Sequence, residues 1–370
     1  MSEMNRIYVD FHVIQTVPPS CVNRDDTGSP KTALYGGVRR ARVSSQSWKR
    51  AMRKVFNEDF RQENFGIRTK RIVSLVETEI RTLQPTIAEE EALSLAERII
   101  KLCGISTKKE NDEEKTKALF FISKTQVHNL AAYIFAHKDD ADKDIKKEAK
   151  KLLNQDHSID IALFGRMVAD EPTFNADASA QVAHSISTHR VDNEYDYFTA
   201  IDDLAPDDNA GADMIGVVEF NSSTMYRYAT VAVHTLAKEL NDEKELTAAA
   251  VKEFAKAFIQ SMPTGKQNTF ANRTLPDAVL VTIRRDQPVN FVGAFESPVR
   301  TTDGGYVAHS IQKLEEYANK IYTNYVDTPE HSWSIGMGDE QNNVNLKELL
   351  QSVHDVLLED FADMASSGQE

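Results

Sequence analysis

The sequence lacks the features that mark membrane, secreted or cysteine-dependent metal proteins. No run of 18 apolar residues occurs in its 370 residues, so it offers no candidate transmembrane helix. It has only two cysteines, Cys21 and Cys103, and no Cys-x-x-Cys pair, which argues against a disulfide framework or a cysteine-based zinc site. The first residues alternate like a strand and show no charged-then-apolar signal peptide. We therefore expect a cytoplasmic protein with no membrane partner.

The motifs of common catalytic families are also missing. The sequence contains no GxSxG, no HExxH and no GxGxxG after a predicted strand. Pro263–Gln267 has the Gly-Lys pair of a P-loop, but position 260 is Gln and no Ser or Thr follows Lys266, which argues against nucleotide hydrolysis. A loop that touches phosphate and an ordinary polar loop both remain open there. His184 and His189 are predicted to lie on opposite faces of a strand. We expect no catalytic residue, no cofactor and no metal.

Basic charge is concentrated in one stretch, Ser20–Lys54. The whole chain has a formal charge of −14, yet this stretch has only two acidic residues. Its nine basic residues are Arg24, Lys31, Arg39, Arg40, Arg42, Lys49, Arg50, Arg53 and Lys54. Such a block focuses a positive potential in a protein whose average charge repels anions. The pattern favours a polyanion bound along a narrow track.

The basic stretch ends in a predicted amphipathic helix. Its apolar residues, at the spacing of one buried helix face, are Trp48, Ala51, Met52, Val55 and Phe56. The cations Lys49 and Arg53 lie four residues apart beside that face, as do Arg50 and Lys54. Ser44 or Ser45 is a suitable N-cap, and free backbone N–H groups next to cations can bind phosphate. The alternative is a solvated basic helix face.

The rest of the chain predicts an α+β fold, with helices packed on a sheet and a helical insertion at about residues 66–155. Strands are expected at 7–13, 180–186, 215–220, 226–233, 278–283 and 289–295, with residues 221–224 as a connection between two of them. Helices are expected at about 124–137, 141–153, 246–261, 309–325 and 344–364. Residues 106–117 are predicted to be a charged, mobile connection. The acidic stretch Asp192–Asp213 is predicted to be an arm that packs on something else.

Several strings of residues match one family signature. The longest are Ser20–Asp26 and Tyr35–Arg53. Shorter strings follow in order at Asp160–Met167, Ala183–His189, Asp196–Leu204, Glu219–Ser223, Tyr226–Ala229, Gly265–Thr269 and Phe295–Arg300. Together they resemble CasC, the backbone subunit of the type I-E CRISPR surveillance complex, Cascade. The likeness spans about residues 7–312, and it is loose over 66–155 and at the carboxyl terminus.

The resemblance implies a hand-shaped protein. An RRM-like (ferredoxin-like) palm would comprise residues 1–65 and 176–325, with helical fingers inserted at 66–175. A thumb would protrude at 193–221, and a helical segment would follow at 326–370. Copies are expected to polymerise along the crRNA spacer, with each thumb reaching its neighbour. The crRNA would pair with target DNA in antiviral defence, so base pairing would supply sequence specificity. Other Cascade subunits and a recruited nuclease-helicase would be further partners.

The resemblance also implies a set of contact residues. The RNA-binding candidates are Arg24, Lys31, Ser45, Gln46, Lys49, Arg50, Arg53, Arg166, Met167, Lys266 and Gln267. In the thumb, Phe198, Thr199 and Leu204 are candidates for contacts between subunits and, like Met167, for wedging against displaced bases. The distal thumb, Ala205–Asp213, is more acidic than the family pattern.

Asp25 and Asp26 define the alternative function. Adjacent loop carboxylates can hold Mg²⁺, but pairing with Arg24 or capping a turn is the simpler interpretation. The resemblance adds a rival of its own, since related backbone subunits of type III effectors cut target RNA with a loop aspartate. The type I-E signature favours a scaffold that is not an enzyme.

Overall fold

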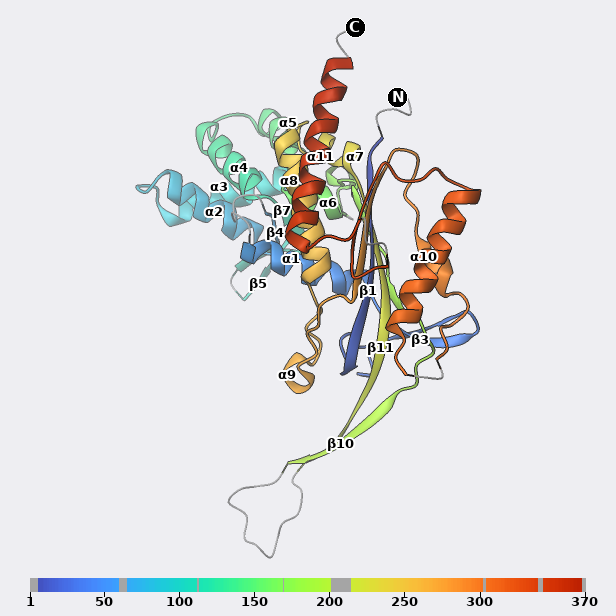
Figure 1. Cartoon of the computed structure of the whole chain (residues 1–370). Helices are drawn as coiled ribbons and strands as arrows, with labels where there is room; N and C mark the ends of the chain where they lie inside the picture. Colours follow the sequence, from blue (N-terminus) through green and yellow to red (C-terminus); the bar gives the residue numbers. More distant parts are fainter. Residues whose placement is uncertain are drawn as a thin grey trace, which may run out of the picture. The chain divides into compact units, whose positions relative to one another are not determined.

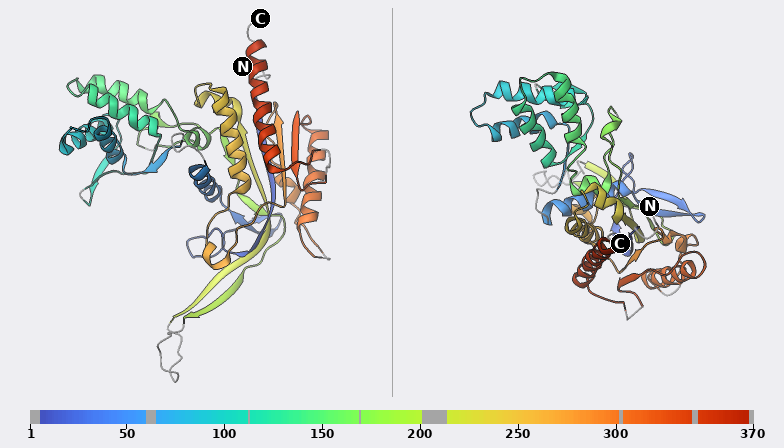
Figure 2. Two further views of the ribbon diagram at one scale, coloured as in Figure 1. Left: turned by 60° about the vertical axis from the view of Figure 1, so that its left-hand side comes forward. Right: turned by 90° about the horizontal axis from the view of Figure 1, so that it is seen from above.

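The computed structural model describes residues 6–59, 65–111, 113–168, 170–200, 214–301, 304–338 and 342–367. The chain divides into two compact units (Figures 1 and 2). Unit 1 comprises Met1–Val55, Val182–Thr230 and Val251–Glu370, and unit 2 comprises Phe56–Gln181 and Val231–Ala250. Both units are discontinuous in sequence.

Unit 1 is built on a largely antiparallel sheet with the strand order β13-β12-β1-β11-β9-β3-β2. The strands are β1 (Tyr8–Ser20), β2 (Thr32–Tyr35), β3 (Val38–Val43), β9 (Ser185–Ser187), β11 (Met214–Ala232), β12 (Ala278–Arg284) and β13 (His331–Ile335). In the register of β1 and β12, Phe11 lies opposite Val281 and Val13 opposite Val279. Alternate apolar side chains of both strands therefore share one face.

Helices cover both faces of this sheet (Figure 1). On one face Phe11 packs against Phe254 of α8 (Lys244–Gln260), with ring centroids 5.4 Å apart. On the other face His12 stacks on Phe291 at 4.3 Å, in the layer of η4 (Phe291–Phe295) and α10 (Val307–Asn324). The remaining helices of unit 1 are α1 (Ser45–Asp59), α9 (Gln267–Phe270) and α11 (Leu346–Ser367). Strand β1 is thus buried on both sides.

A buried arginine joins four of these elements. Arg227 of β11 is 1% exposed and donates to Gln15 Oε1 of β1 at 2.5 Å and to the Phe258 carbonyl oxygen of α8. Its guanidinium lies 3.8 Å from the ring centroid of Trp48 of α1. Burial lowers the pKa of Arg227 to about 9. The sheet and two of its helices therefore meet at one cation.

Two predictions about strands are wrong. Strand β11 runs without a break through residues 221–224, because Asn221 and Thr224 are buried and keep hydrogen-bond partners there. Asn221 donates its side-chain amide to Asn193, and the Thr224 carbonyl accepts from Thr188 N–H at 2.8 Å. The segment predicted as a strand at 289–295 contains η4, which begins where the Asn290 side chain accepts from the Val292 N–H at 3.0 Å.

A two-stranded ribbon extends from the sheet (Figures 1 and 2). Strand β10 (Glu194–Ala200) pairs antiparallel with the first part of β11, with Tyr197 opposite Val217. Tyr195, Tyr197 and Val217 are all at least 60% exposed. Part of the predicted arm is therefore a β-ribbon. The rest of it, including Leu204 and Ala205–Asp213, lies outside the described residues.

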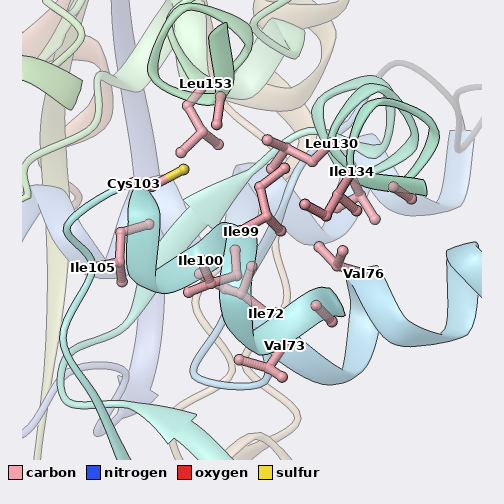
Figure 3. Packing of buried hydrophobic residues seen from close by; sticks show 14 of the residues in the cluster. Ile72, Val73, Val76, Ile99, Ile100, Cys103, Ile105, Leu130, Ile134 and Leu153 are labelled. Carbon is pink, nitrogen blue, oxygen red and sulfur yellow. The ribbon is translucent and has the colours of Figure 1, made fainter. Parts of the chain in front are cut away.

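Unit 2 is mainly helical. Its helices are α2 (Ile72–Leu83), α3 (Glu89–Leu102), α4 (Lys124–Ala136), α5 (Asp142–Leu153), α6 (Ile159–Phe164), η3 (Pro172–Phe174) and α7 (Val233–Glu239). Its strands are β4 (Ile67–Thr69), β5 (Thr107–Glu110), β6 (Glu113–Thr116), β7 (Phe120–Ile122) and β8 (Ala180–Val182). Figure 3 shows Ile72, Ile99, Leu130 and Leu153 packed together in its core.

The prediction of a mobile connection at 106–117 is wrong, because these residues include the antiparallel hairpin β5–β6. Asn111 sits at its turn with φ +52°, a conformation that Asn tolerates better than most residues. Lys108 pairs with Glu110 and Lys115 with Glu113. The charges that suggested a solvated linker thus line the hairpin.

Cys21 and Cys103 are both buried, and each has a free thiol. Within the described part of the chain, no helix is long and apolar enough to cross a membrane.

His12 makes the stability of unit 1 sensitive to acid. Burial lowers the pKa of His12 to about 3, so this ring stays neutral in the folded protein well below its unfolded pKa of about 6.5. Between these values the unfolded chain binds more protons, and the free energy of unfolding falls as the pH falls. His12→Phe keeps a ring against Phe291 and removes this titration. From pH 7 to pH 4.5 the variant should lose roughly 2–3 kcal/mol less than the wild type.

Urea unfolding at a series of pH values measures this difference. Burial raises the pKa of Asp10 to about 6, which gives the opposite pH dependence, but Asp10 is present in both proteins. Its contribution therefore cancels in the comparison. Parallel pH profiles of the two proteins would contradict the assignment to His12.

Candidate nucleic-acid interface

The start of α1 is fixed by two polar side chains. Of the two predicted N-cap candidates, Ser44 caps the helix, with its hydroxyl accepting from the Ser47 N–H at 3.3 Å and its carbonyl from the Trp48 N–H at 3.2 Å. The Ser44 N–H in turn donates to Asn23 Oδ1 at 2.9 Å. The loop that begins at Asn23 is therefore attached to the first turn of the helix.

The two faces of α1 differ as the sequence predicts. Trp48 and Met52 are at most 1% exposed, and the Trp48 indole N–H donates to Ser185 Oγ at 2.9 Å. Arg50 and Lys54 are exposed on the other side, while Lys49 and Arg53 are half-buried. Burial lowers the pKa of Lys49. The row formed by Arg50 and Lys54 is thus the more accessible of the two cation rows.

Three segments meet around an open cavity of about 620 Å³. They are the loop Val22–Gly28, the exposed side of α1 from Ser47 to Lys54, and the loop Met262–Lys266. Gly265 allows the two loops to touch, since a Cβ there would lie 2.8 Å from the Cys21 carbonyl oxygen and closer still to that of Val22. Lys266 follows with φ +46°, a strained conformation for a residue with a side chain.

Positive charge predominates in the cavity. Arg24, Arg50, Lys54 and Lys266 line it, together with Asp25 and Asp26. One of these acids is occupied within its own loop, because Asp25 Oδ1 accepts from the Thr27 hydroxyl at 2.7 Å and from the Thr27 and Ser29 N–H groups at 3.0 Å. These bonds, first of all that from the Thr27 hydroxyl, lower the pKa of Asp25.

Asp25 therefore caps a turn, which agrees with the simpler of the two interpretations from the sequence. Among the residues that the structure describes, no group of three His, Cys, Asp or Glu side chains is arranged to hold a metal ion.

The structure brings three predicted RNA-binding residues, Arg24, Arg50 and Lys266, into this cavity. Ser45, Gln46, Lys49 and Arg53 lie on the same helix, and Gln267 begins α9 next to Lys266. Lys31 lines a separate small recess with Arg42 and Asn221. Lys54 was not among the predicted site residues, although its position four residues after Arg50 signals the same helix row.

The prediction that Arg166 contacts RNA is not supported by its position in unit 2. Arg166 is 4% exposed, and its guanidinium donates to the carbonyl oxygens of Phe174 and Leu153 at 2.7 Å and of Phe121 at 3.3 Å. Burial lowers its pKa to about 10. The neighbouring Met167 is 85% exposed. Of these two adjacent RNA-binding candidates, only Met167 has a side chain that solvent can reach.

Two of the three predicted thumb residues are described. Phe198 of β10 is 40% exposed, and its ring covers Gly216 on the paired strand, where a Cβ would collide with it. Thr199 is exposed beside it on the ribbon. Leu204 lies outside the described residues.

Comparison with known proteins identifies the family. Residues 9–361 match the CT1975-like proteins, and the chain belongs to this family. No curated protein matches the sequence.

Two solved structures share the fold over nearly the whole chain. One is described as a "CRISPR RNA-guided surveillance complex, pre-nicking", with a TM-score of 0.80 and 30% identity over 95% of this chain and 100% of that chain. The other is described as a "CRISPR RNA-guided surveillance complex", with a TM-score of 0.70 and 26% identity over 95% of this chain and 99% of that chain. The cavity therefore belongs to a fold found in complexes that carry a guide RNA.

Gly265→Ala tests the contact between the two loops of the cavity. The new Cβ would collide with backbone atoms of Cys21 and Val22, so we expect a loss of about 1–3 kcal/mol in the free energy of unfolding. Gly338→Ala is the matched control, because its Cβ would lie 3.5 Å from the nearest atom. Urea unfolding measures both. Equal stability of the two variants would show that the loops are not in close contact.

Proposed function

We propose that the protein is the crRNA-binding backbone subunit of a type I-E CRISPR surveillance complex, presenting the crRNA spacer for pairing with target DNA. The observation that carries the proposal is the cation-lined cavity at the capped start of α1, in a chain similar over 95% of its length to chains of CRISPR RNA-guided surveillance complexes. Helix N-termini flanked by cations bind phosphate.

The order of the central strands supports an RRM-like palm. Strands β12-β1-β11-β9 lie side by side, with α1 between β1 and β9 in sequence and α8 between β11 and β12. Counted along the chain, this is a βαββαβ unit with strand order 4-1-3-2, which is the ferredoxin-like arrangement. Because α8 and α10 cover its two faces, the sheet cannot offer RNA an open stacking surface. The loops and α1 remain as the RNA track.

The chemistry of the cavity suits the RNA backbone better than the bases. Its cations suit phosphate groups, and its volume is open to solvent. Sequence would then be recognised by pairing between the crRNA and target DNA. We propose that further copies bind side by side in a filament, using the exposed Tyr195, Tyr197 and Val217 of the ribbon. Other Cascade subunits and a recruited nuclease-helicase would complete this cytoplasmic assembly.

A role without catalysis is supported by the state of the loop carboxylates. Asp25 is committed to its own turn. Asp26 is exposed and lines the cavity, and this position favours the alternative function, an RNA-guided endoribonuclease like type III backbone subunits. We propose the scaffold as the function and test the alternative through Asp26.

Neutralising the accessible cation row tests RNA binding. Arg50→Gln combined with Lys54→Gln should weaken guide binding, and the slope of log affinity against log salt should fall by about 0.7 for each lost phosphate contact. Filter binding of a guide RNA over a salt series measures both. The matched control is Lys320→Gln, which removes an exposed cation of α10 on the opposite face of the sheet. A slope equal to that of the control would remove this row from the RNA track.

Whether RNA is cut in the presence of Mg²⁺ distinguishes a scaffold from a nuclease. The protein co-expressed with its CRISPR array and partner subunits should retain an intact guide of one length after Mg²⁺ is added, and added complementary RNA should stay whole. Gel analysis of both strands gives the answer. Complementary RNA cut at regular spacing by the wild type, and left whole by Asp26→Asn, would establish the nuclease instead.

A further inference from the structure

Met167 is an apolar side chain held out into solvent. Its 85% exposure is the highest among the large hydrophobic residues of the described chain. A single exposed methionine needs no explanation by itself. The backbone around Met167 is unusual, however, because hydrogen bonds hold the residue before it and the residue after it in place.

Arg166 provides the anchor before it. The Arg166 backbone forms two hydrogen bonds with Ala176, N–H to carbonyl at 3.0 Å and carbonyl to N–H at 2.9 Å. Its buried guanidinium reaches the end of α5 at Leu153, β7 at Phe121 and η3 at Phe174. Figure 3 shows Leu153 in the core of unit 2. One side chain therefore attaches this segment to three elements of the core.

Asn175 provides the anchor after it. Asn175 Oδ1 accepts from the Val168 N–H at 2.7 Å, and the Val168 side chain packs against the core of unit 2. Gly165 enters the segment with φ +76°, and a Cβ there would lie 2.9 Å from the Ala176 carbonyl oxygen. The segment 165–168 thus lies tightly along residues 174–178, which leaves the Met167 side chain as its free part.

We infer that Arg166 and Asn175 are positioning residues that hold Met167 in the conformation in which it contacts a nucleobase of the guide. This inference rests on the proposed function. A thioether is polarizable and makes favourable contacts with aromatic rings, and a base exposes such a face. Anchoring both neighbours in advance removes main-chain freedom that would otherwise be lost on binding. Arg166 thus acts on RNA through Met167 and does not touch it.

The test uses the assembled complex with a guide that carries 2-aminopurine at one position at a time. This base brightens when it leaves the stack of its neighbours. Arg166→Met would remove buried hydrogen bonds and endanger the fold of unit 2. Asn175→Ala therefore carries the test, because Asn175 is exposed. Thr173→Ala is the matched control, since Thr173 is exposed in the same segment and its hydroxyl donates to Glu171 rather than to residues 166–168.

At the positions where the wild-type complex is brightest, Met167→Ala and Asn175→Ala should each lower the fluorescence by at least half. The double variant should match Met167→Ala alone, and Thr173→Ala should match the wild type. Guide affinity of the control Thr173→Ala should stay within twofold of the wild type. Hydrogen exchange at the Val168 amide should be at least tenfold faster in Asn175→Ala.

Four results would overturn the inference. Asn175→Ala could keep the wild-type fluorescence, it could lower the signal equally when Met167 is already absent, or the Val168 amide could exchange at its usual rate. If the guide is bound but Met167→Ala is as bright as the wild type, the inference fails while the proposed function stands. A wild-type complex that retains no guide would refute the proposed function itself.

Discussion

The cation of Arg227 is the contact on which the architecture of unit 1 depends. A buried guanidinium is costly unless its donors are satisfied, so the groups that satisfy it must stay in place. These groups come from β1, α1 and α8, which are far apart in sequence. The position of α1 against the sheet, and with it the cation row of Arg50 and Lys54, follows from this arrangement. The buried Arg227 therefore helps to fix the positions of the exposed Arg50 and Lys54.

The cation-lined cavity is a local exception to the acidic charge of the chain. Its formal charge of −14 repels nucleic acid on average, whereas the cavity concentrates four cations from three segments of the chain. At physiological ionic strength charges act over about 8 Å, so the local cluster outweighs the distant acids. In the function that we propose, binding would be confined to one track, which suits a protein that holds a guide and leaves other nucleic acid alone.

The sequence predicted α1 well because its signals are local. The helical period from Trp48 to Phe56 and the capping serine need no tertiary information. The strand through Asn221 and Thr224 was interpreted as a loop because its polar side chains find partners only in the folded sheet. The burial of Arg166 is hidden from the sequence for a similar reason, since the carbonyl groups that surround it come from other segments of the chain. Sequence patterns over a few turns therefore predict where a helix lies. Whether a charged side chain is buried depends on residues that only the folded unit brings together.

The continuity of β11 has a mechanical consequence. The same strand lies in the centre of the sheet beside β1 and forms one half of the ribbon with β10, without a hinge between the two parts. At about 3.3 Å per residue, its 19 residues span roughly 60 Å. Because the ribbon and the core share this strand, a force that acts on the ribbon also acts on the hydrogen bonds between β11 and its neighbours in the sheet. The number of residues in β11 therefore sets how far the ribbon extends from the core of the sheet.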